Sequence, residues 1–122
     1  MIAEFFYERI FQMVELKYDS DRKSLAAVII GEIDHHSAEG MRDKIDEAIY
    51  VFKPHKIILD FTSVSFMDSS GIGLIMGRYR TSRYHGGEVF VKVKDERIKK
   101  ILSLSGIDKL VSIIGGKNED NK

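Results

Sequence analysis

The chain has no cysteine and no excess of either charge. Without cysteine it forms no disulfides and carries no thiolate chemistry. Nineteen basic residues balance nineteen acidic ones, which excludes the basic excess expected of a nucleic-acid-binding surface. No apolar run approaches the roughly 20 residues of a membrane span, and Glu4, Glu8 and Arg9 interrupt the apolar N-terminus, so we expect no signal peptide. These absences favour a cytoplasmic protein that binds neither nucleic acid nor membrane.

The composition and periodicity that remain predict one α/β domain. Of the 122 residues, 43% are hydrophobic and 31% are charged, as in soluble globular proteins. Period-two alternation or short apolar runs predict strands over Met13–Asp19, Leu25–Ile33, Ile57–Phe61, Glu88–Val93 and Leu110–Ile114. Apolar residues at helical spacing predict helices over Ala38–Phe52, after Asp68 and over Lys94–Ser105. Pro54 ends the first of these helices, and Gly106 caps the last.

The two ends of the chain lie outside this pattern. Helical spacing within residues 1–12 and just beyond predicts an N-terminal helix, with its stripe formed by Ile2, Phe5, Phe6, Ile10 and Met13. Three roles are open for it: an extra helix covering the sheet, a contact to another chain, or a frayed tail. We expect intramolecular packing, because an aromatic stripe is more often core than interface. Residues 115–122 are predicted to form a polar tail.

The central stretch Ile57–Tyr84 predicts a strand, a polar turn over Thr62–Ser65 and a helix with the stripe Ile72, Ile75, Met76 and Tyr79. Asp68, Ser69 and Ser70 stand where that helix begins. Unpaired N–H groups and the helix dipole favour a capping oxygen or a phosphate there.

Three glycines, Gly71, Gly73 and Gly77, lie inside this predicted helix, and each costs roughly 0.5–1 kcal/mol relative to alanine. We interpret them as places where another backbone comes close, either a neighbouring strand or a partner protein. The arginines of Arg78–Arg83 are interpreted as solvated charges at the helix C-terminus.

Other chemistry is not supported by the spacing of polar residues. His35 and His36 are adjacent, but no third ligand follows at a metal-binding spacing, so we predict no metal site. The segment around Ser69 lacks the first glycine of a nucleophile elbow, and Gly77 comes one residue too late for a dinucleotide-binding motif. There is no Walker lysine either. We therefore predict that the chain is not an enzyme and binds no cofactor.

Four segments in order carry a resemblance to a known family. FMDSSGIGLIMGRYR resembles the central motif of the STAS-domain anti-sigma factor antagonists, and GEIDHHSA resembles their first strand-to-helix loop. Gly86-Gly87-Glu88 and Leu104–Ile107 are similar to their later turns. The resemblance covers residues 13–114 and is greatest to the sporulation sigma-F antagonists. It implies a STAS fold, with a mixed four- to five-stranded sheet and packed helices, between the extension of residues 1–12 and the tail.

The same resemblance implies a function and a site. The unphosphorylated protein would bind an anti-sigma factor with serine kinase activity and free a sigma factor. Phosphorylation of Ser69 would end that binding, and a serine phosphatase would restore it. The implied partner-binding residues are Asp34, His35, Ser37, Met67, Asp68, Ser70, Gly71 and Ile72. The free chain is expected to be monomeric. An alternative within the fold is a scaffold or sensor module of a stressosome-type complex.

Overall fold

The computed structural model describes residues 6–11 and 13–115, with only the backbone of residues 6–11 described. Ten elements follow one another: β1 (Phe6–Phe11), β2 (Val14–Asp19), β3 (Ser24–Ile33), α1 (His35–Phe52), β4 (Lys56–Met67), α2 (Ser69–Tyr84), β5 (Glu88–Lys92), α3 (Glu96–Ser105), a short 3₁₀ helix η1 (Ile107–Lys109) and β6 (Ser112–Ile114). In this part of the chain no helix is long and apolar enough to cross a membrane.

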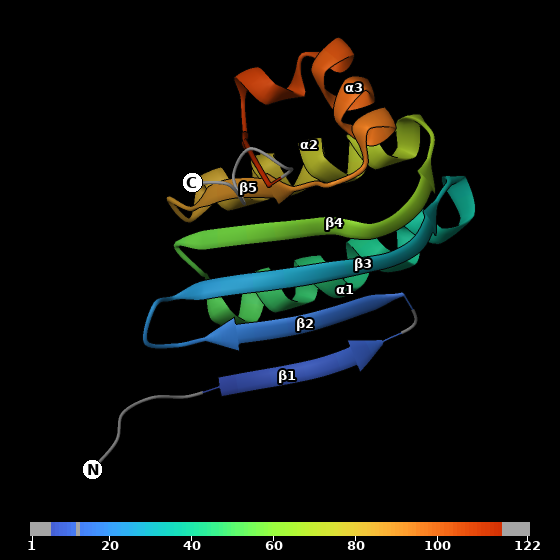
Figure 1. Cartoon of the computed structure of the whole chain (residues 1–122). Coiled ribbons are helices and arrows are strands. Elements are labelled where there is room, and N and C mark those ends of the chain that lie inside the picture. Colours follow the sequence, from blue (N-terminus) through green and yellow to red (C-terminus); the bar gives the residue numbers. More distant parts are fainter. Residues whose placement is uncertain (1–5, 12, 116–122) are drawn as a thin grey trace.

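The strands form one mixed sheet in the order of the sequence, β1-β2-β3-β4-β5-β6. The first three pair antiparallel, and the last four pair parallel. Each parallel connection contains a helix. Since crossovers of one hand place successive helices on one face when the strands advance in one direction, α1 and α2 lie side by side behind the sheet (Figure 1). This confirms the α/β prediction.

The N-terminal segment corrects the prediction of a helix. Phe6–Phe11 forms β1, which pairs with β2 from Phe6 opposite Asp19 to Phe11 opposite Val14. Aromatic and β-branched residues favour strands, and the outer edge of β2 offers unpaired N–H and C=O groups that a helix would leave unsatisfied. The sheet therefore has six strands, one more than the largest number expected. Ile2 and Phe5 of the predicted stripe lie outside the described residues, as does most of the predicted tail.

β4 is longer than the strand predicted from its apolar residues. It runs from Lys56 to Met67, straight through the segment predicted as a polar turn. The register with β3 shifts after Asp60, whose carboxylate accepts hydrogen bonds from the backbone N and Oγ1 of Thr62 at 2.9 and 2.6 Å. Beyond this irregularity β4 extends past the end of β5 and pairs only with β3. Polar side chains are tolerated there because they point into solvent.

The core lies between the sheet and the two helices behind it. β2, β3 and β5 contribute alternate residues, as the period-two pattern predicts, and α1 contributes Met41, Ile45, Ala48 and Ile49. The largest fully buried side chain is Phe61 of β4. This packing fixes the positions of α1 and α2 and hence of the loops that precede them.

Candidate functional site

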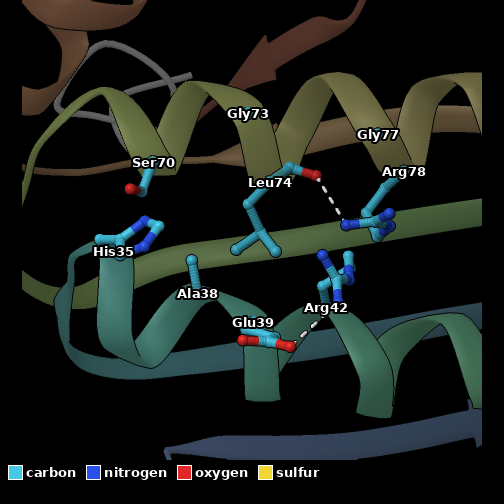
Figure 2. A pocket seen from close by; sticks show the side chains of 9 residues that line it. All are labelled: His35, Ala38, Glu39, Arg42, Ser70, Gly73, Leu74, Gly77 and Arg78. Carbon is cyan, nitrogen blue, oxygen red and sulfur yellow. Dashed lines mark hydrogen bonds and ion pairs between the residues drawn. The ribbon is translucent and has the colours of Figure 1, made fainter.

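The two polar loops singled out in the sequence lie together at one edge of the sheet. β3 and β4 are parallel neighbours, so the loops that follow them emerge at the same end. The backbone N–H of Asp68 donates to the carbonyl of Ile33 over 3.2 Å, which joins one loop to the other. Figure 2 shows His35 of α1 directed toward Ser70 of α2. The loops that follow β3 and β4 are therefore adjacent in space.

At the first loop, a closed set of hydrogen bonds starts α1. Asp34 is the N-cap, and its Oδ1 accepts from the N–H of Ser37 at 2.9 Å. The Ser37 hydroxyl accepts from the N–H of Asp34 at 3.0 Å and donates to the carbonyl of Glu32 at 2.9 Å. The hydrogen bond from the Ser37 amide lowers the pKa of Asp34 below its usual value. The helix was expected to start later, at Ala38. Asp34 and Ser37 are thus already engaged within the domain.

At the second loop, the start of α2 is open. Asp68 is again the N-cap, and its Oδ1 accepts from the N–H of Ser70 at 2.7 Å. Ser69 is the first residue of the helix and is exposed, whereas Ser70 is half-buried. The Ser69 hydroxyl makes no hydrogen bond to any residue that the structure describes. A modifying enzyme or a partner can therefore reach it without disrupting the fold.

Two of the predicted partner-binding residues are buried, and their part in binding stays a prediction. Met67 was expected as an apolar contact, yet its side chain is only 3% exposed. Gly71 was expected to admit a partner backbone, but it is buried beneath this methionine, and a Cβ added there would stand 2.6 Å from Met67 Sδ. Ile72 is half-buried against the core and keeps some exposed surface. The sequence predicted a strand that ends at Phe61 and a polar turn over Thr62–Ser65, so no predicted element placed Met67 in the core; in the structure β4 continues to Met67.

A groove of about 310 Å³ lies between α1 and α2, next to these loops (Figure 2). One wall comes from α1 and the other from α2. The lining residues are His35, Ala38, Glu39 and Arg42 on α1, and Ser70, Gly73, Leu74, Gly77 and Arg78 on α2. Gly73 and Gly77 differ from Gly71, because a Cβ added to either would meet nothing within 4 Å. Sequence reasoning found these glycines but did not assign them to a groove.

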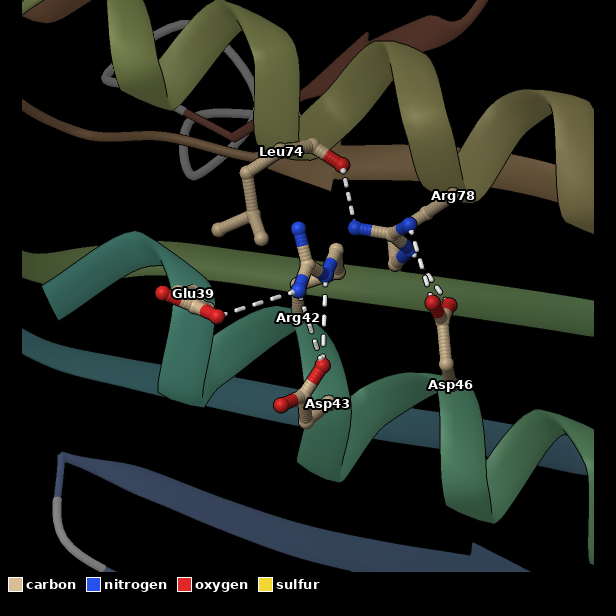
Figure 3. A network of polar contacts seen from close by, with 6 residues as sticks. All are labelled: Glu39, Arg42, Asp43, Asp46, Leu74 and Arg78. Atoms are coloured by element: carbon tan, nitrogen blue, oxygen red, sulfur yellow. Dashed lines mark hydrogen bonds and ion pairs between the residues drawn. The ribbon is translucent and has the colours of Figure 1, made fainter. Parts of the chain in front are cut away.

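The arginines of Arg78–Arg83 were interpreted as solvated charges, and for Arg78 this interpretation is wrong. Arg78 is 5% exposed and faces α1, where its Nη2 donates to Asp46 Oδ2 at 3.1 Å (Figure 3). Its Nε lies 2.7 Å from Asp46 Oδ1 as an ion pair without hydrogen-bond alignment. Its Nη1 donates to the carbonyl of Leu74 at 3.3 Å. Helical spacing from Gly71 and Leu74 places position 78 on the buried face, a signal that the sequence already contained.

Burial opposes the charge of both partners in this pair. Desolvation raises the pKa of Asp46 and lowers the pKa of Arg78, and their mutual attraction only partly offsets each shift. Arg42 differs, because it is half-exposed and forms surface ion pairs with Asp43 at 3.1 Å and Glu39 at 3.8 Å. Arg78 therefore joins α1 to α2, while Arg42 is a polar group on the wall of the groove.

The loop histidines show no metal-binding arrangement in the described part of the chain. The rings of His35 and His36 meet edge to face with centroids 6.2 Å apart. No cluster of three or more histidine, aspartate or glutamate residues suited to a metal occurs among the residues searched. Both histidines are exposed. The absence of a bound metal stays a prediction, and the position of His35 is that of a surface group beside Ser70.

Comparison with known proteins agrees with the predicted fold. Residues 20–119 match the STAS domain family, so this chain belongs to that family. Within it, the chain is similar to anti-sigma factor antagonists. It is 34% identical to the anti-sigma F factor antagonist of Paenibacillus polymyxa over 100 residues, which cover 82% of this chain and 86% of the relative. These relatives are named for opposing a regulator rather than for a reaction, in agreement with the prediction that the chain is not an enzyme.

Solved structures extend the likeness to three dimensions. The anti-sigma factor antagonist SpoIIAA in its unphosphorylated form aligns with a TM-score of 0.69 at 28% identity, covering 96% of this chain and 92% of that one. The phosphorylated form of SpoIIAA, described as a Bacillus cell fate determinant, aligns with a TM-score of 0.62 at 28% identity, covering 96% of each chain. The same fold has thus been solved with and without a phosphate.

Proposed function

We propose that this chain is an anti-sigma factor antagonist controlled by phosphorylation of Ser69. Unphosphorylated, it binds an anti-sigma factor that is also a serine kinase, and the sigma factor is freed. Phosphorylation of Ser69 by that kinase ends the binding, and a serine phosphatase restores it. The observation that carries the proposal is the exposed Ser69 at the first position of α2, with its hydroxyl unengaged among the described residues. The existence of a phosphorylated form of SpoIIAA supports it.

The switch acts by local charge rather than by refolding. A phosphoserine carries about −1.5 to −2 charges at neutral pH. The N-terminus of α2 tolerates that charge because its dipole and free N–H groups favour anions. In a complex, the phosphate of Ser69 would be desolvated beside the carboxylate of Asp68, so repulsion and lost hydration both oppose docking. A penalty of about 2.7 kcal/mol weakens binding roughly a hundredfold.

The partner surface is narrower than the sequence suggested. We assign it to the groups that the structure leaves accessible at this edge, which include His35, Ser69 and the remaining exposed part of Ile72. Ser70 contributes from the groove wall. Asp34 and Ser37 shape the first loop from within, and Met67 and Gly71 hold the second loop against the core.

The test uses the purified anti-sigma F factor of Paenibacillus polymyxa, because the antagonist of that system is 34% identical to this chain. The wild-type chain is incubated with this protein and ATP, and tandem mass spectrometry locates the phosphate. Calorimetry then measures the affinity of the wild-type chain, its phosphorylated form, Ser69→Ala and Ser69→Asp. We expect phosphate on Ser69 alone. Affinity should fall about a hundredfold for the phosphorylated chain, fall clearly for Ser69→Asp and change little for Ser69→Ala.

Ser70→Ala is the matched control, since it removes the neighbouring hydroxyl and leaves Ser69 intact. It should remain phosphorylatable, although its place on the groove wall can alter docking. Phosphate found on Ser70 or Thr62 instead of Ser69 would refute the assignment. Undiminished binding by the phosphorylated chain would refute the mechanism, even with the phosphate on Ser69.

A further inference from the structure

The groove between α1 and α2 is hollow in part because two of its wall residues, Gly73 and Gly77, have no side chain. Both lie inside α2, where glycine lowers helix stability relative to alanine. The packing of the domain requires neither of them, since a Cβ added at Gly73 or Gly77 would meet nothing within 4 Å. Neither has a positive φ. The two glycines therefore preserve open space between the helices.

Arg42 supplies this space with an unused hydrogen-bond donor. Asp43 Oδ1 accepts from the Nε and Nη2 of Arg42 at 3.2 and 3.1 Å, and Glu39 lies 3.8 Å from the same Nη2. The Nη1 of Arg42 has no hydrogen bond or ion pair to a residue that the structure describes. Figure 3 shows a nitrogen of this guanidinium directed toward α2, away from both carboxylates. The carboxylates thus neutralise one side of Arg42 and leave the other side to the groove.

Arg78 is arranged in the same way from the opposite wall. Asp46 contacts its Nε and Nη2, and its Nη1 has a long hydrogen bond of 3.3 Å to the carbonyl of Leu74 (Figure 2). An Nη1 group carries two hydrogens, so one remains for a further acceptor. Two guanidinium groups, one from each helix, therefore present Nη1 donors to the same groove.

The rest of the lining is partly apolar and partly hydroxyl and imidazole. Ala38 and Leu74 provide apolar surface next to the glycines. At the end nearest the helix starts, the hydroxyl of Ser70 and the ring of His35 have no hydrogen bond to a described residue (Figure 2). Glu39 is the acidic residue of the lining, but its side chain is 73% exposed, so water screens its charge.

We propose that this groove binds a small organic anion, with its carboxylate or phosphate on the Nη1 groups of Arg42 and Arg78 and its apolar body against Ala38 and Gly77. Guanidinium groups match the planar charge of a carboxylate and the oxygens of a phosphate. The volume of about 310 Å³ lies at the lower end of the roughly 300–1,000 Å³ of ligand pockets, which suits a small molecule. The site goes beyond the proposed function and requires no protein partner.

The test titrates the chain alone with benzoate and with phenyl phosphate, followed by two-dimensional amide NMR spectra. Benzamide is the neutral counterpart of benzoate. We expect saturable shifts of the amide signals of Ala38, Gly73 and Gly77, with a dissociation constant on the order of 1 mM or tighter. Benzamide should bind at least about tenfold more weakly, because it lacks the charge that pairs with the arginines. The probe with the lower dissociation constant identifies the preferred head group.

Two pairs of variants locate the binding. Gly77→Leu fills the groove, and Gly40→Leu is its control, because Gly40 also lies inside a helix with nothing within 4 Å of its Cβ position but does not line the groove. Arg42→Gln removes a charge from the lining, and Arg80→Gln removes an exposed charge of α2 outside it. Gly77→Leu should abolish the shifts, Arg42→Gln should weaken binding at least about tenfold, and both controls should bind as the wild-type chain does.

Three results would overturn the inference: no saturable shift of the wild-type chain with either probe, equal binding of benzamide and benzoate, or wild-type affinity in Arg42→Gln. The last result decides the matter even where Gly77→Leu fails to fold, since Arg42 has its ion pairs at the surface. Because no anti-sigma factor is present in the experiment, any of these results leaves the proposed function untouched.

Discussion

The two helix starts at the edge of the sheet contain the same residue types, but they differ in whether a serine hydroxyl is hydrogen-bonded. Both α1 and α2 are capped by an aspartate that accepts a backbone hydrogen bond from a serine. At α1 the hydroxyl of Ser37 accepts from the N–H of Asp34 and donates to the carbonyls of Glu32 at 2.9 Å and Asp34 at 3.5 Å, so the loop is closed on itself. At α2 the hydroxyl of Ser69 is exposed and has no partner in the described structure. A serine whose hydroxyl is already hydrogen-bonded has a structural role, whereas a serine whose hydroxyl has no partner is available for modification.

The two helix starts stay together at one edge only while α1 and α2 remain packed side by side. Replacing Arg78, which joins these two helices, should therefore have the largest effect on stability. Arg78→Met leaves the Asp46 carboxylate in the interface of α1 and α2 without its partner. We expect the free energy of unfolding to fall by about 2–4 kcal/mol, because removal of one partner from a buried pair leaves an uncompensated charge. The partial exposure of the Asp46 side chain, 36%, favours the lower end. Urea unfolding followed by circular dichroism measures the loss.

Two variants sharpen this first prediction. Arg42→Ala removes an arginine of the same groove whose ion pairs lie at the surface, and it should cost no more than about 1 kcal/mol. The double variant Arg78→Met with Asp46→Leu should regain part of the lost stability, because no charge remains buried. Equal losses for Arg78→Met and Arg42→Ala would show that the interhelical pair contributes nothing beyond a surface contact.

A smaller effect comes from replacing one serine at a time. Ser37→Ala removes an acceptor for the Asp34 N–H and a donor to the Glu32 carbonyl, which should lower the free energy of unfolding by about 1–2 kcal/mol. Ser69→Ala removes no hydrogen bond within the described structure and should change it by less than about 0.5 kcal/mol. Thermal and urea unfolding of both variants provide the measurement. A Ser69→Ala loss as large as that of Ser37→Ala would erase the distinction between the closed and the open helix start.

Much of this fold follows from local patterns. The alternation of β2 places Val14, Leu16 and Tyr18 inside, and the stripe of α1 places Met41 and Ile45 inside. The Asp68 cap of α2 and a glycine in the left-handed region after α3, with φ of 83°, also match what the sequence predicts. The order of strands and helices then brings the two loops together. Each of these features depends on near neighbours in the chain, which is why the sequence alone contains it.

The features that the sequence did not predict depend on contacts between residues that are far apart in the chain. β1 is a strand because β2 offers an edge, although the spacing of its apolar residues is helical. The polar residues of β4 after Asp60 are in a strand because β3 extends beside them. Arg78 is buried because Asp46, 32 residues away, neutralises it. Met67 and Gly71 are buried because they pack on each other. Such pairings are set by tertiary contacts, and local patterns contain only part of the information, as the helical spacing that places Arg78 on the buried face of α2 does.

The smallest predicted effect is a pH dependence at the closed helix start. The hydrogen bond from the Ser37 amide is the main cause of the lowered pKa of Asp34, whose ordinary value is 3.8. Because its pKa in the folded protein lies below that in the unfolded chain, ionised Asp34 stabilises the fold above about pH 4. That contribution is lost as the pH falls through the folded pKa. Asparagine also caps helices well but does not titrate.

Asp34→Asn should therefore unfold at a lower urea concentration than the wild-type chain at pH 7, and the two midpoints should converge as the pH falls below about 4. Asp95, whose pKa Arg97 lowers to about 2, and Asp46, whose pKa burial raises, titrate in both proteins and cancel in the difference. Asp68→Asn, measured in parallel, is the matched variant at the open helix start. A gap between Asp34→Asn and wild type that stays constant down to pH 2 would show that the charge of Asp34 does not stabilise the capping box, and that asparagine differs only in geometry.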